Sequence, residues 1–174
     1  ATPSVVLTTV GTGLFRTAGT QFDLLGLDFQ AIYLRPAGQL QPQLTRFLFD
    51  PANSQIVYAS TEAADGAVWK STDGGLKWSQ VNNGLPTTGG FVVGLQFEPG
   101  NSSILYCAIA DGVYKSSDGA ANWTRIGTLP GNTTVFLISP HNRQLWLCSQ
   151  ENRIRRSLDG GVTWLLGSTL PIAP

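Results

Sequence analysis

Short apolar segments separated by polar turn residues run along the whole chain. The segments are rich in Val, Ile, Leu, Tyr, Phe, Trp and Thr, and 20 glycines and 10 prolines are spread between them. No stretch keeps the 3.6-residue period of an amphipathic helix over about ten residues. Strand-length runs bounded by turn signals predict an all-β fold.

The apolar pattern repeats along the chain. One nine-residue motif occurs three times, as KSTDGGLKW, KSSDGAANW and RSLDGGVTW, starting at residues 70, 115 and 156. Its aspartates, Asp73, Asp118 and Asp159, are 45 and 41 residues apart. Upstream of the motifs, FLFDPANSQIVYAS, LQFEPGNSSILYCA and FLISPHNRQLWLCS also align. A period of about 40–45 residues that holds four short strands is typical of a β-propeller blade.

We interpret the 174 residues as one repeat domain. Residues 1–27 are a degenerate partial blade that lacks a first strand, and residues 28–43 are an insertion expected to form a long loop. Full blades are expected at 44–85, 92–130 and 133–171. Their innermost strands should lie at 44–49, 92–97 and 135–139, and their second strands at 56–60, 104–108 and 145–149. The prediction is a small propeller of about four four-stranded blades, incomplete where the last blade meets the first.

The repeated motif, Ser-x-Asp-x-Gly-x-x-Trp, resembles the Asp-box, also called the BNR repeat. Proteins that carry it include sialidases, xyloglucanase-type glycosidases, the sortilin propeller and photosystem assembly factors. The resemblance covers residues 44–171 and implies that each box folds the hairpin between the third and fourth strands of a blade, away from the ligand face. The structural box residues that it implies are Ser71, Asp73, Gly75, Trp78, Ser116, Asp118, Trp123, Ser157, Asp159, Gly161 and Trp164.

The chemistry of these residue types agrees with a structural role. An aspartate accepts hydrogen bonds from backbone amides two residues on, and glycine allows a positive φ in a tight turn. The tryptophan supplies a large apolar body that packs between units. We therefore expect the three aspartates to hold turns and to take no part in catalysis.

The repeats explain seven of the eleven acidic side chains. Besides the box aspartates, these are Asp50 and Glu98, which precede equivalent prolines, and Asp65 and Asp111 in hairpin turns. The remaining four are Asp23, Asp28, Glu62 and Glu151. A glycosidase needs two carboxylates about 5–10 Å apart across a bound sugar, and nothing in the spacing of these four indicates such a pair.

The chain departs from sialidases in its catalytic features. Those enzymes use an arginine cluster, a tyrosine–glutamate pair and an Arg-Ile-Pro motif, and this sequence has no Arg-Ile-Pro. Sialidase propellers also have more blades than this chain can build, and xyloglucanases are larger still. We predict no catalytic residues and favour a protein that is not an enzyme.

The histidine and the cysteines fit the repeat pattern as well. His141, the only histidine, lies in a turn sequence shared by the three repeats, so we interpret it as a turn residue. With no Cys/His cluster, the sequence predicts neither a metal site nor a cofactor. Cys107 and Cys148 occupy one position in successive blades, which is generally too far apart for the 4.4–6.8 Å Cα separation of a disulfide. We expect two buried free thiols.

Four residues are candidates for binding: Arg153, Arg155, Tyr33 and Trp146. Arg153 and Arg155 share one face of a strand. Either they are solvated because the last blade lacks a neighbour, or they contact an anion or a partner. An exposed Tyr33 or Trp146 would favour stacking on a sugar, whereas a flat apolar or charged patch would favour a protein partner.

Composition narrows the choice of partner. Eleven basic and eleven acidic residues give a net charge of zero, which removes the electrostatic reason to expect nucleic acid. The longest apolar runs are far shorter than the roughly 18 residues that span a bilayer, so we expect a soluble chain without a membrane span. The leading hypothesis is a non-catalytic binding or scaffold module whose protein partner contacts the inner-strand loops, including 86–91, and the insertion at 28–43. A carbohydrate-binding domain or a fragment of a glycoside hydrolase is the alternative.

The sequence does not determine how the propeller ring is closed. An incomplete blade leaves a sheet edge that invites pairing with another chain. The sequence allows a slightly open four-bladed propeller, a homodimer of two half-rings, or one piece of a longer protein. It does not decide the localisation, for which an extracytoplasmic or secreted site is favoured.

Overall fold

The computed structural model describes residues 44–62, 67–88, 90–109, 112–151 and 153–167, together with the course of three strands before residue 33. The strands of all these segments form four antiparallel sheets. The N-terminal sheet contains β1 (Val5–Val10), β2 (Gly13–Ala18) and β3 (Gln30–Ile32). Sheet 1 contains β4 (Arg46–Phe49), β5 (Val57–Ser60), β6 (Val68–Ser71) and β7 (Ser79–Gln80). Sheet 2 contains β8 (Val92–Glu98), β9 (Asn101–Ile109), β10 (Gly112–Ser116) and β11 (Thr124–Thr128). Sheet 3 contains β12 (Thr133–Ile138), β13 (Trp146–Gln150), β14 (Arg153–Ser157) and β15 (Leu165–Leu166).

Each of sheets 1, 2 and 3 is a four-stranded meander in which consecutive strands pair. The first and second strands of each meander lie where the repeat pattern predicts them. The all-β prediction is therefore confirmed.

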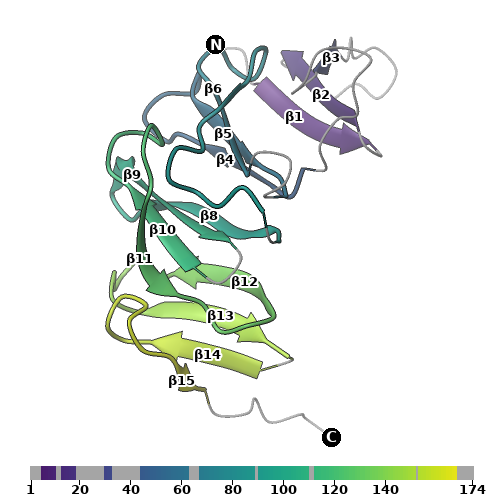
Figure 1. The fold of residues 1–174 in the computed structure, drawn as a ribbon. Coiled ribbons are helices and arrows are strands. Elements are labelled where there is room, and N and C mark those ends of the chain that lie inside the picture. Colours follow the sequence, from purple (N-terminus) through teal and green to yellow (C-terminus); the bar gives the residue numbers. More distant parts are fainter. Residues whose placement is uncertain are drawn as a thin grey trace, which may run out of the picture.

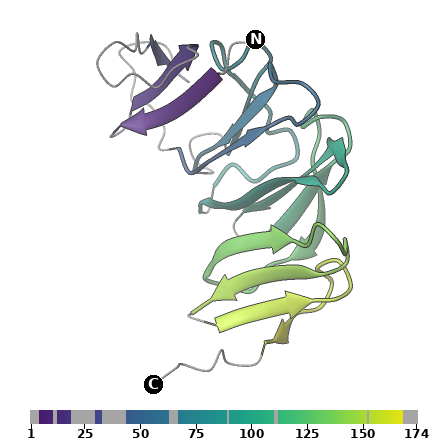
Figure 2. The same ribbon diagram turned by 180° about the vertical axis from the view of Figure 1, so that it is seen from behind.

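The four sheets follow one another along an arc, with the N-terminal sheet at one end and sheet 3 at the other (Figures 1 and 2). Sheets 1, 2 and 3 meet through their first strands, since β8 contacts both β4 and β12. A fan of four-stranded meanders joined at their first strands is the arrangement of neighbouring blades in a β-propeller. The arc does not close, so the fold is part of a propeller.

The expectation of a long loop at residues 28–43 is wrong in part. β3 lies within this range and pairs with β2, so that Leu14 faces Ile32 and Arg16 faces Gln30. The N-terminal sheet thus has three strands, in the order β1-β2-β3. Pairing with β3 gives hydrogen-bond partners to the backbone N–H and C=O groups on the edge of β2 that faces away from β1. A strand of three residues is too short to produce a readable alternation in the sequence.

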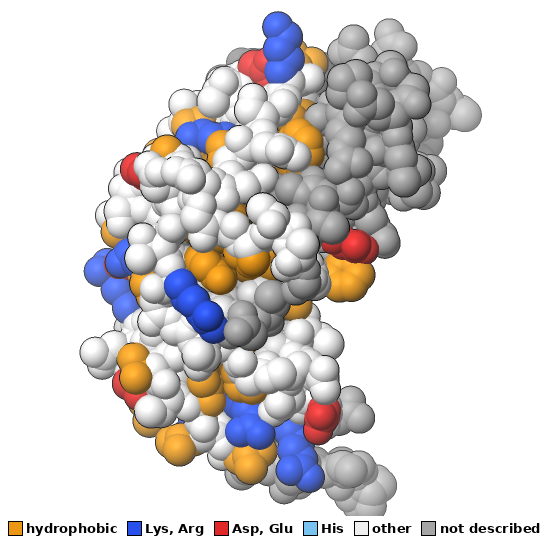
Figure 3. Space-filling view, in the orientation of Figure 1, with side chains coloured by type: hydrophobic (Ala, Val, Ile, Leu, Met, Phe, Trp, Pro, Cys, Tyr) orange, Lys and Arg blue, Asp and Glu red, His pale blue; other side chains and the backbone are white. Residues whose placement is uncertain are grey.

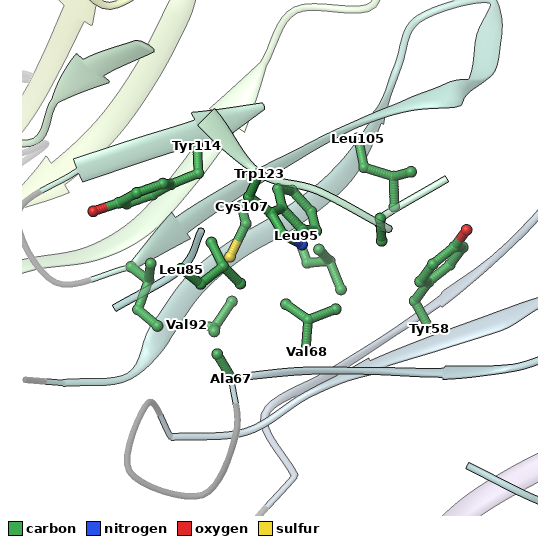
Figure 4. Packing of buried hydrophobic residues seen from close by; sticks show 12 residues of the cluster. Tyr58, Ala67, Val68, Leu85, Val92, Leu95, Leu105, Cys107, Tyr114 and Trp123 are labelled. Carbon is green, nitrogen blue, oxygen red and sulfur yellow. The ribbon is translucent and has the colours of Figure 1, made fainter. Parts of the chain in front are cut away.

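The core lies between successive sheets. We call the face that a sheet turns toward the next sheet in the chain its forward face, and the opposite one its rear face. Between sheets 1 and 2, Tyr58 and Val68 on the forward face of sheet 1 pack against Leu105 and Trp123 on the rear face of sheet 2 (Figure 4). Between sheets 2 and 3, Tyr106 packs edge-on against Trp146, with ring centroids 5.7 Å apart. Burial of both faces in these interfaces is the main source of stability for such a stack.

Candidate functional site

Three similar turns join the third strand of each sheet to its fourth strand. In the first, the Ser71 hydroxyl donates to the Asp73 carboxylate (2.8 Å) and accepts from the Gly75 amide (2.8 Å). The same carboxylate oxygen accepts from the amides of Leu76 (3.0 Å) and Lys77 (2.9 Å). The aspartate therefore bonds to amides three and four residues on, and not two as the sequence led us to expect.

The other two turns repeat this geometry. Ser116 donates to Asp118 at 2.8 Å, and Ser157 donates to Asp159 at 2.6 Å. In each turn two successive residues have a positive φ; the six are Gly74, Gly75, Gly119, Ala120, Gly160 and Gly161. The three serines are buried, and their hydroxyls act as donor and acceptor inside the turn. Each aspartate thus organises its own turn, and the three carboxylates do not converge on a common site.

The hydrogen bonds stabilise the charged form of these carboxylates. Donation from the side chain and amide of Asn122 and from Ser116 lowers the pKa of Asp118 to about 2. Donation from the hydroxyls of Ser157 and Thr163 lowers the pKa of Asp159 to about 2. Desolvation acts to raise the pKa of Asp73, but bonds from its turn outweigh it and the pKa is lowered. Three ionised carboxylates held in this way suit a structural role and not proton transfer.

The turns also join neighbouring sheets. Tyr58 and Lys70 of sheet 1 both donate to the carbonyl of Gly119 in the turn of sheet 2, at 3.1 and 2.9 Å. The Trp123 indole donates to the carbonyl of Val81 (2.8 Å), and the Trp164 indole donates to that of Thr128 (2.8 Å). These two tryptophans reach back to the preceding unit, whereas the Trp78 indole bonds within its own turn, to the carbonyl of Gly75.

The described residues hold seven carboxylate side chains, and six of them are engaged. Three belong to the turns above, and Asp50 accepts from the amides of Ala52 and Asn53. Glu151 accepts from the Asn132 amide group. Glu98 is only 8 % exposed; it accepts from the Tyr106 hydroxyl (2.5 Å) and forms an ion pair with Arg143 (3.1 Å).

Glu98 precedes a proline as Asp50 does, but the contacts of the two carboxylates differ. Asp50 closes its own turn, and so does Ser139, which accepts from the amides of His141 and Asn142 at the same place in sheet 3. Glu98 instead links sheets 2 and 3, because Arg143 belongs to the turn between β12 and β13. Burial and the bond to Glu98 raise the pKa of Tyr106. Glu98 also lines a cavity of about 520 Å³ whose other walls are mostly apolar, among them Phe97, Pro99 and Ile138.

A second cavity, of about 310 Å³, lies among the first strands of the three sheets. It is lined by Thr45, Arg46, Phe91, Val92, Val93, Thr133 and Thr134. The Phe91 ring is 52 % exposed, although its backbone is fixed by an antiparallel bridge to Glu62. Arg46 donates to the carbonyl of Val93 (3.0 Å), which ties the rim of sheet 1 to that of sheet 2.

Three of the four candidate binding residues are described, and none lies in this cavity. Trp146 is 3 % exposed and its indole donates to the carbonyl of Arg143, so it offers no exposed ring to a ligand and its prediction as a possible binding residue is wrong. Arg155 faces Cys148 across the β13–β14 pair, and Cys148 faces Phe136 across the β12–β13 pair. Arg153 and Arg155 therefore belong to the rear face of sheet 3, and not to its forward face. Tyr33 lies outside the described residues.

The arginine pair does not form an anion site by itself. Arg155 is half-buried and donates to the side chain of Gln150, whereas Arg153 is exposed at the end of β14. The structure places the residues on the same side of the strand, as predicted. It gives Arg155 a partner within its own sheet.

His141 and the two cysteines behave as expected from the repeats. His141 is exposed in its turn, and both cysteines are free and buried. Burial raises the pKa of each thiol. Across the described ranges, no group of three His, Cys, Asp or Glu side chains could hold a metal ion. Nor do those ranges contain a helix long and apolar enough to cross a membrane.

Phe91 is the residue that the sequence did not single out. The sequence indicates the loop 86–91 as a whole, and Phe91 is its large apolar side chain. The sequence signal for an exposed aromatic residue here is its position, after a Gly-Gly pair and immediately before a strand. Its exposure depends on the neighbouring sheets, which the local sequence does not specify.

Comparisons with known proteins place the chain among propellers. It is 30 % identical over 120 residues to a xyloglucanase of a Paenibacillus species, a match that covers 56 % of this chain and 11 % of the relative. The fold matches an ancestral GH74 enzyme with a TM-score of 0.59 at 15 % identity, covering 94 % of this chain and 24 % of the other. It also matches YCF48 from Cyanidioschyzon merolae with a TM-score of 0.50 at 19 % identity, covering 71 % and 36 %. No protein-family model matches the chain. The chain spans only 11–13 % of the length of the curated relatives, all of them xyloglucanases.

Proposed function

We propose that the chain is a non-catalytic binding module of the Asp-box propeller type, which holds a protein partner at the cavity beside Phe91. In this proposal the three Ser-x-Asp turns are Asp-boxes, and the blades of the single repeat domain are residues 44–85, 92–130 and 133–171. Arg153, exposed at the end of β14, is kept as a secondary contact for the partner.

The exposed ring of Phe91 carries the proposal. A large aromatic side chain held half in water on a fixed backbone is typical of the anchors that dominate protein interfaces. The cavity beside it offers an apolar wall from Val92 and Val93 and polar groups from Arg46, Thr133 and Thr134. This mixture suits an extended peptide segment with one apolar side chain and a polar backbone.

The carboxylate inventory supports the absence of catalysis. Six of the seven described carboxylates are held by turns, an ion pair or an amide group. The seventh, Glu62, does not line the cavity. Hydrolysis of a glycoside uses two carboxylates on opposite sides of the bond. The described residues do not present such a pair.

A carbohydrate-binding role is the second candidate, because the curated relatives are xyloglucanases. A shared propeller fold does not transfer an activity, since function depends on the residues of the site. The ring of Phe91 would serve a sugar by stacking as well as it serves an apolar peptide side chain. Both candidate functions therefore use Phe91 as the contact residue, and they differ in the ligand that it binds.

Selection from a displayed random-peptide library tests the proposal. We expect the intact chain to enrich peptides that share an apolar residue, and Phe91→Ser to weaken their binding at least about tenfold, as for a typical aromatic anchor. Leu76→Ser is the matched control, since Leu76 is also exposed, at 44 %, but lies in a box turn. Xyloglucan oligosaccharides should not raise the melting temperature. A sugar-dependent rise that Phe91→Ser abolishes would assign the site to a glycan, and hydrolysis of xyloglucan would make the chain an enzyme.

A further inference from the structure

The forward face of sheet 3 is an apolar surface left open at the end of the arc. Its exposed side chains include Leu137 (52 %), Leu147 (36 %), Ile154 (43 %) and Leu165 (51 %). Strand pairing places three of them in one row with Arg156, because Leu137 faces Leu147, Leu147 faces Arg156 and Arg156 faces Leu165. Ile154 lies on the same face in the next row, where it faces Ser149. Orange and blue side chains mix at this end of the molecule (Figure 3).

Two of these positions, those of Leu147 and Ile154, are buried by the next sheet in the other two sheets. Leu147 corresponds to Tyr58 and Tyr106, which are 1 % and 7 % exposed. Ile154 corresponds to Val68 and Val113, which are both 0 % exposed. Sheet 3 thus keeps apolar residues where its counterparts have a neighbour, and the two internal interfaces show what that neighbour is.

Arg156, the charged residue of this face, also has counterparts that contact the next sheet or an aromatic ring. Lys70 of sheet 1, the counterpart of Arg156, lies 5.3 Å from the centre of the Tyr58 ring and donates to the Gly119 carbonyl of the next turn. Lys115 of sheet 2 lies over the Tyr106 ring in the same way. Arg156 retains the positive charge but has Leu147 beside it in place of a tyrosine ring. A turn carbonyl of a following sheet would give it the partner that Lys70 has.

We propose that the forward face of sheet 3 is the docking site of one further four-stranded repeat of the same kind, joined to it in tandem. Its rear face would present large apolar residues as sheet 3 does with Phe136, Ile138 and Trp146, and its Ser-x-Asp turn would offer a carbonyl to Arg156. The proposed interface would repeat the contacts between sheets 1 and 2 and between sheets 2 and 3, and it does not depend on the proposed function.

Extension of the full chain by one repeat tests this directly. Residues 131–171 are duplicated immediately after Pro171, so that the added unit follows a Leu-Pro pair as sheet 3 does. We expect the melting temperature to rise by at least about 5 °C. Amide hydrogen exchange in β13 and β14 should slow at least about tenfold, since the face is no longer open.

Ile154→Lys should abolish both effects in the extended chain, while leaving the circular dichroism of the original chain unchanged because Ile154 is exposed there. Leu76→Lys is the control, since Leu76 has nearly the same exposure and lies away from this face. Leu147→Lys repeats the test at a second position. An extended chain with neither a rise in melting temperature nor slower exchange would overturn the proposal. So would a dimer of the original chain that Ile154→Lys dissociates, because a second copy would then be the natural occupant.

Discussion

Ala120 has a positive φ of 74°, at a position where the other two turns have glycine. Its side chain is fully buried, whereas a Cβ on Gly161 would lie 2.2 Å from Cζ3 of Trp146. In sheet 2 the counterpart of Trp146 is Leu105, a smaller residue that packs in one cluster with Ala120. Sheet 2 therefore has a smaller residue than sheet 3 beneath its turn, and the methyl group of Ala120 packs there without the clash expected at Gly161.

Gly161→Ala should destabilise the protein by about 3 kcal/mol, because it combines a left-handed backbone with a clash in the core. Ala120→Gly should change stability by less than about 1 kcal/mol, since relief of backbone strain offsets the lost methyl group and the added freedom of the unfolded chain. Urea unfolding measures both. In a Trp146→Leu background the cost of Gly161→Ala should fall, and equal costs in the two backgrounds would refute the pairing.

The lowered pKa values of Asp118 and Asp159 predict loss of stability in acid. A carboxylate whose pKa is lower in the folded state stabilises it above the unfolded pKa of about 3.9, and this contribution disappears as the pH falls toward 2. The melting temperature should therefore drop between about pH 5 and pH 2. Asp159→Asn should flatten that drop, and Glu151→Gln, outside the turns, serves as the control. An unchanged profile in Asp159→Asn would contradict the assignment.

At this scale the sequence predicts the turns better than the surface. Ser71 and Asp73 lie close together in the chain, so their motif reports a local geometry directly. The burial of Trp146 was not predictable, because alternation along a strand does not say which face receives a neighbour. The ion pair between Glu98 and Arg143 joins residues of different repeats. No motif within one repeat indicates it, because the equivalent residues Asp50 and Ser139 bond within their own turns.

Elements are joined by a small set of polar contacts at the margins of the apolar interfaces. Between sheets 1 and 2, Tyr58 and Lys70 share one acceptor, the Gly119 carbonyl. Between sheets 2 and 3, Tyr106 and Arg143 share the Glu98 carboxylate. The second contact involves a nearly buried charge, so it is the more sensitive of the two.

Tyr106→Phe should cost about 1–3 kcal/mol, because it leaves one oxygen of a buried carboxylate without its hydroxyl donor. Tyr58→Phe should cost about 1 kcal/mol or less, because Lys70 continues to donate to the Gly119 carbonyl. Chemical denaturation of the two variants under the same conditions compares them. A larger effect at Tyr58 would show that the carboxylate link contributes less than the turn contact.

Strand positions could be predicted from the repeats because three aligned copies average out local exceptions. β3 could not, since it belongs to a unit whose motif has decayed and it spans three residues. The arc could not be predicted either. It depends on how the sheets fan from their first strands, a property of packing between repeats and not of any one of them.

Over the whole molecule, the buried thiols report on the integrity of the stack. Cys107 is 0 % and Cys148 is 3 % exposed, and they lie on the rear faces of sheets 2 and 3. A thiol-specific reagent at pH 8 should modify Cys148 faster than Cys107 in the folded chain, and both thiols rapidly after denaturation, because sheet 3 has a neighbouring sheet on one side only. Equal rates for the two cysteines under native conditions would mean that sheet 3 does not separate from sheet 2 without global unfolding.

Because sheet 2 contacts sheets 1 and 3 through its first strand, the three described sheets form a one-dimensional series of coupled segments. Sheet 2 is clamped on both sides, whereas sheet 3 is clamped on one. Opening should therefore begin at the terminal segment and move inward, so that calorimetric and van't Hoff enthalpies disagree. An open arc of blades thus replaces the all-or-none melting of a closed ring by a gradient of local stability, in which sheet 3 is less stable than sheet 2.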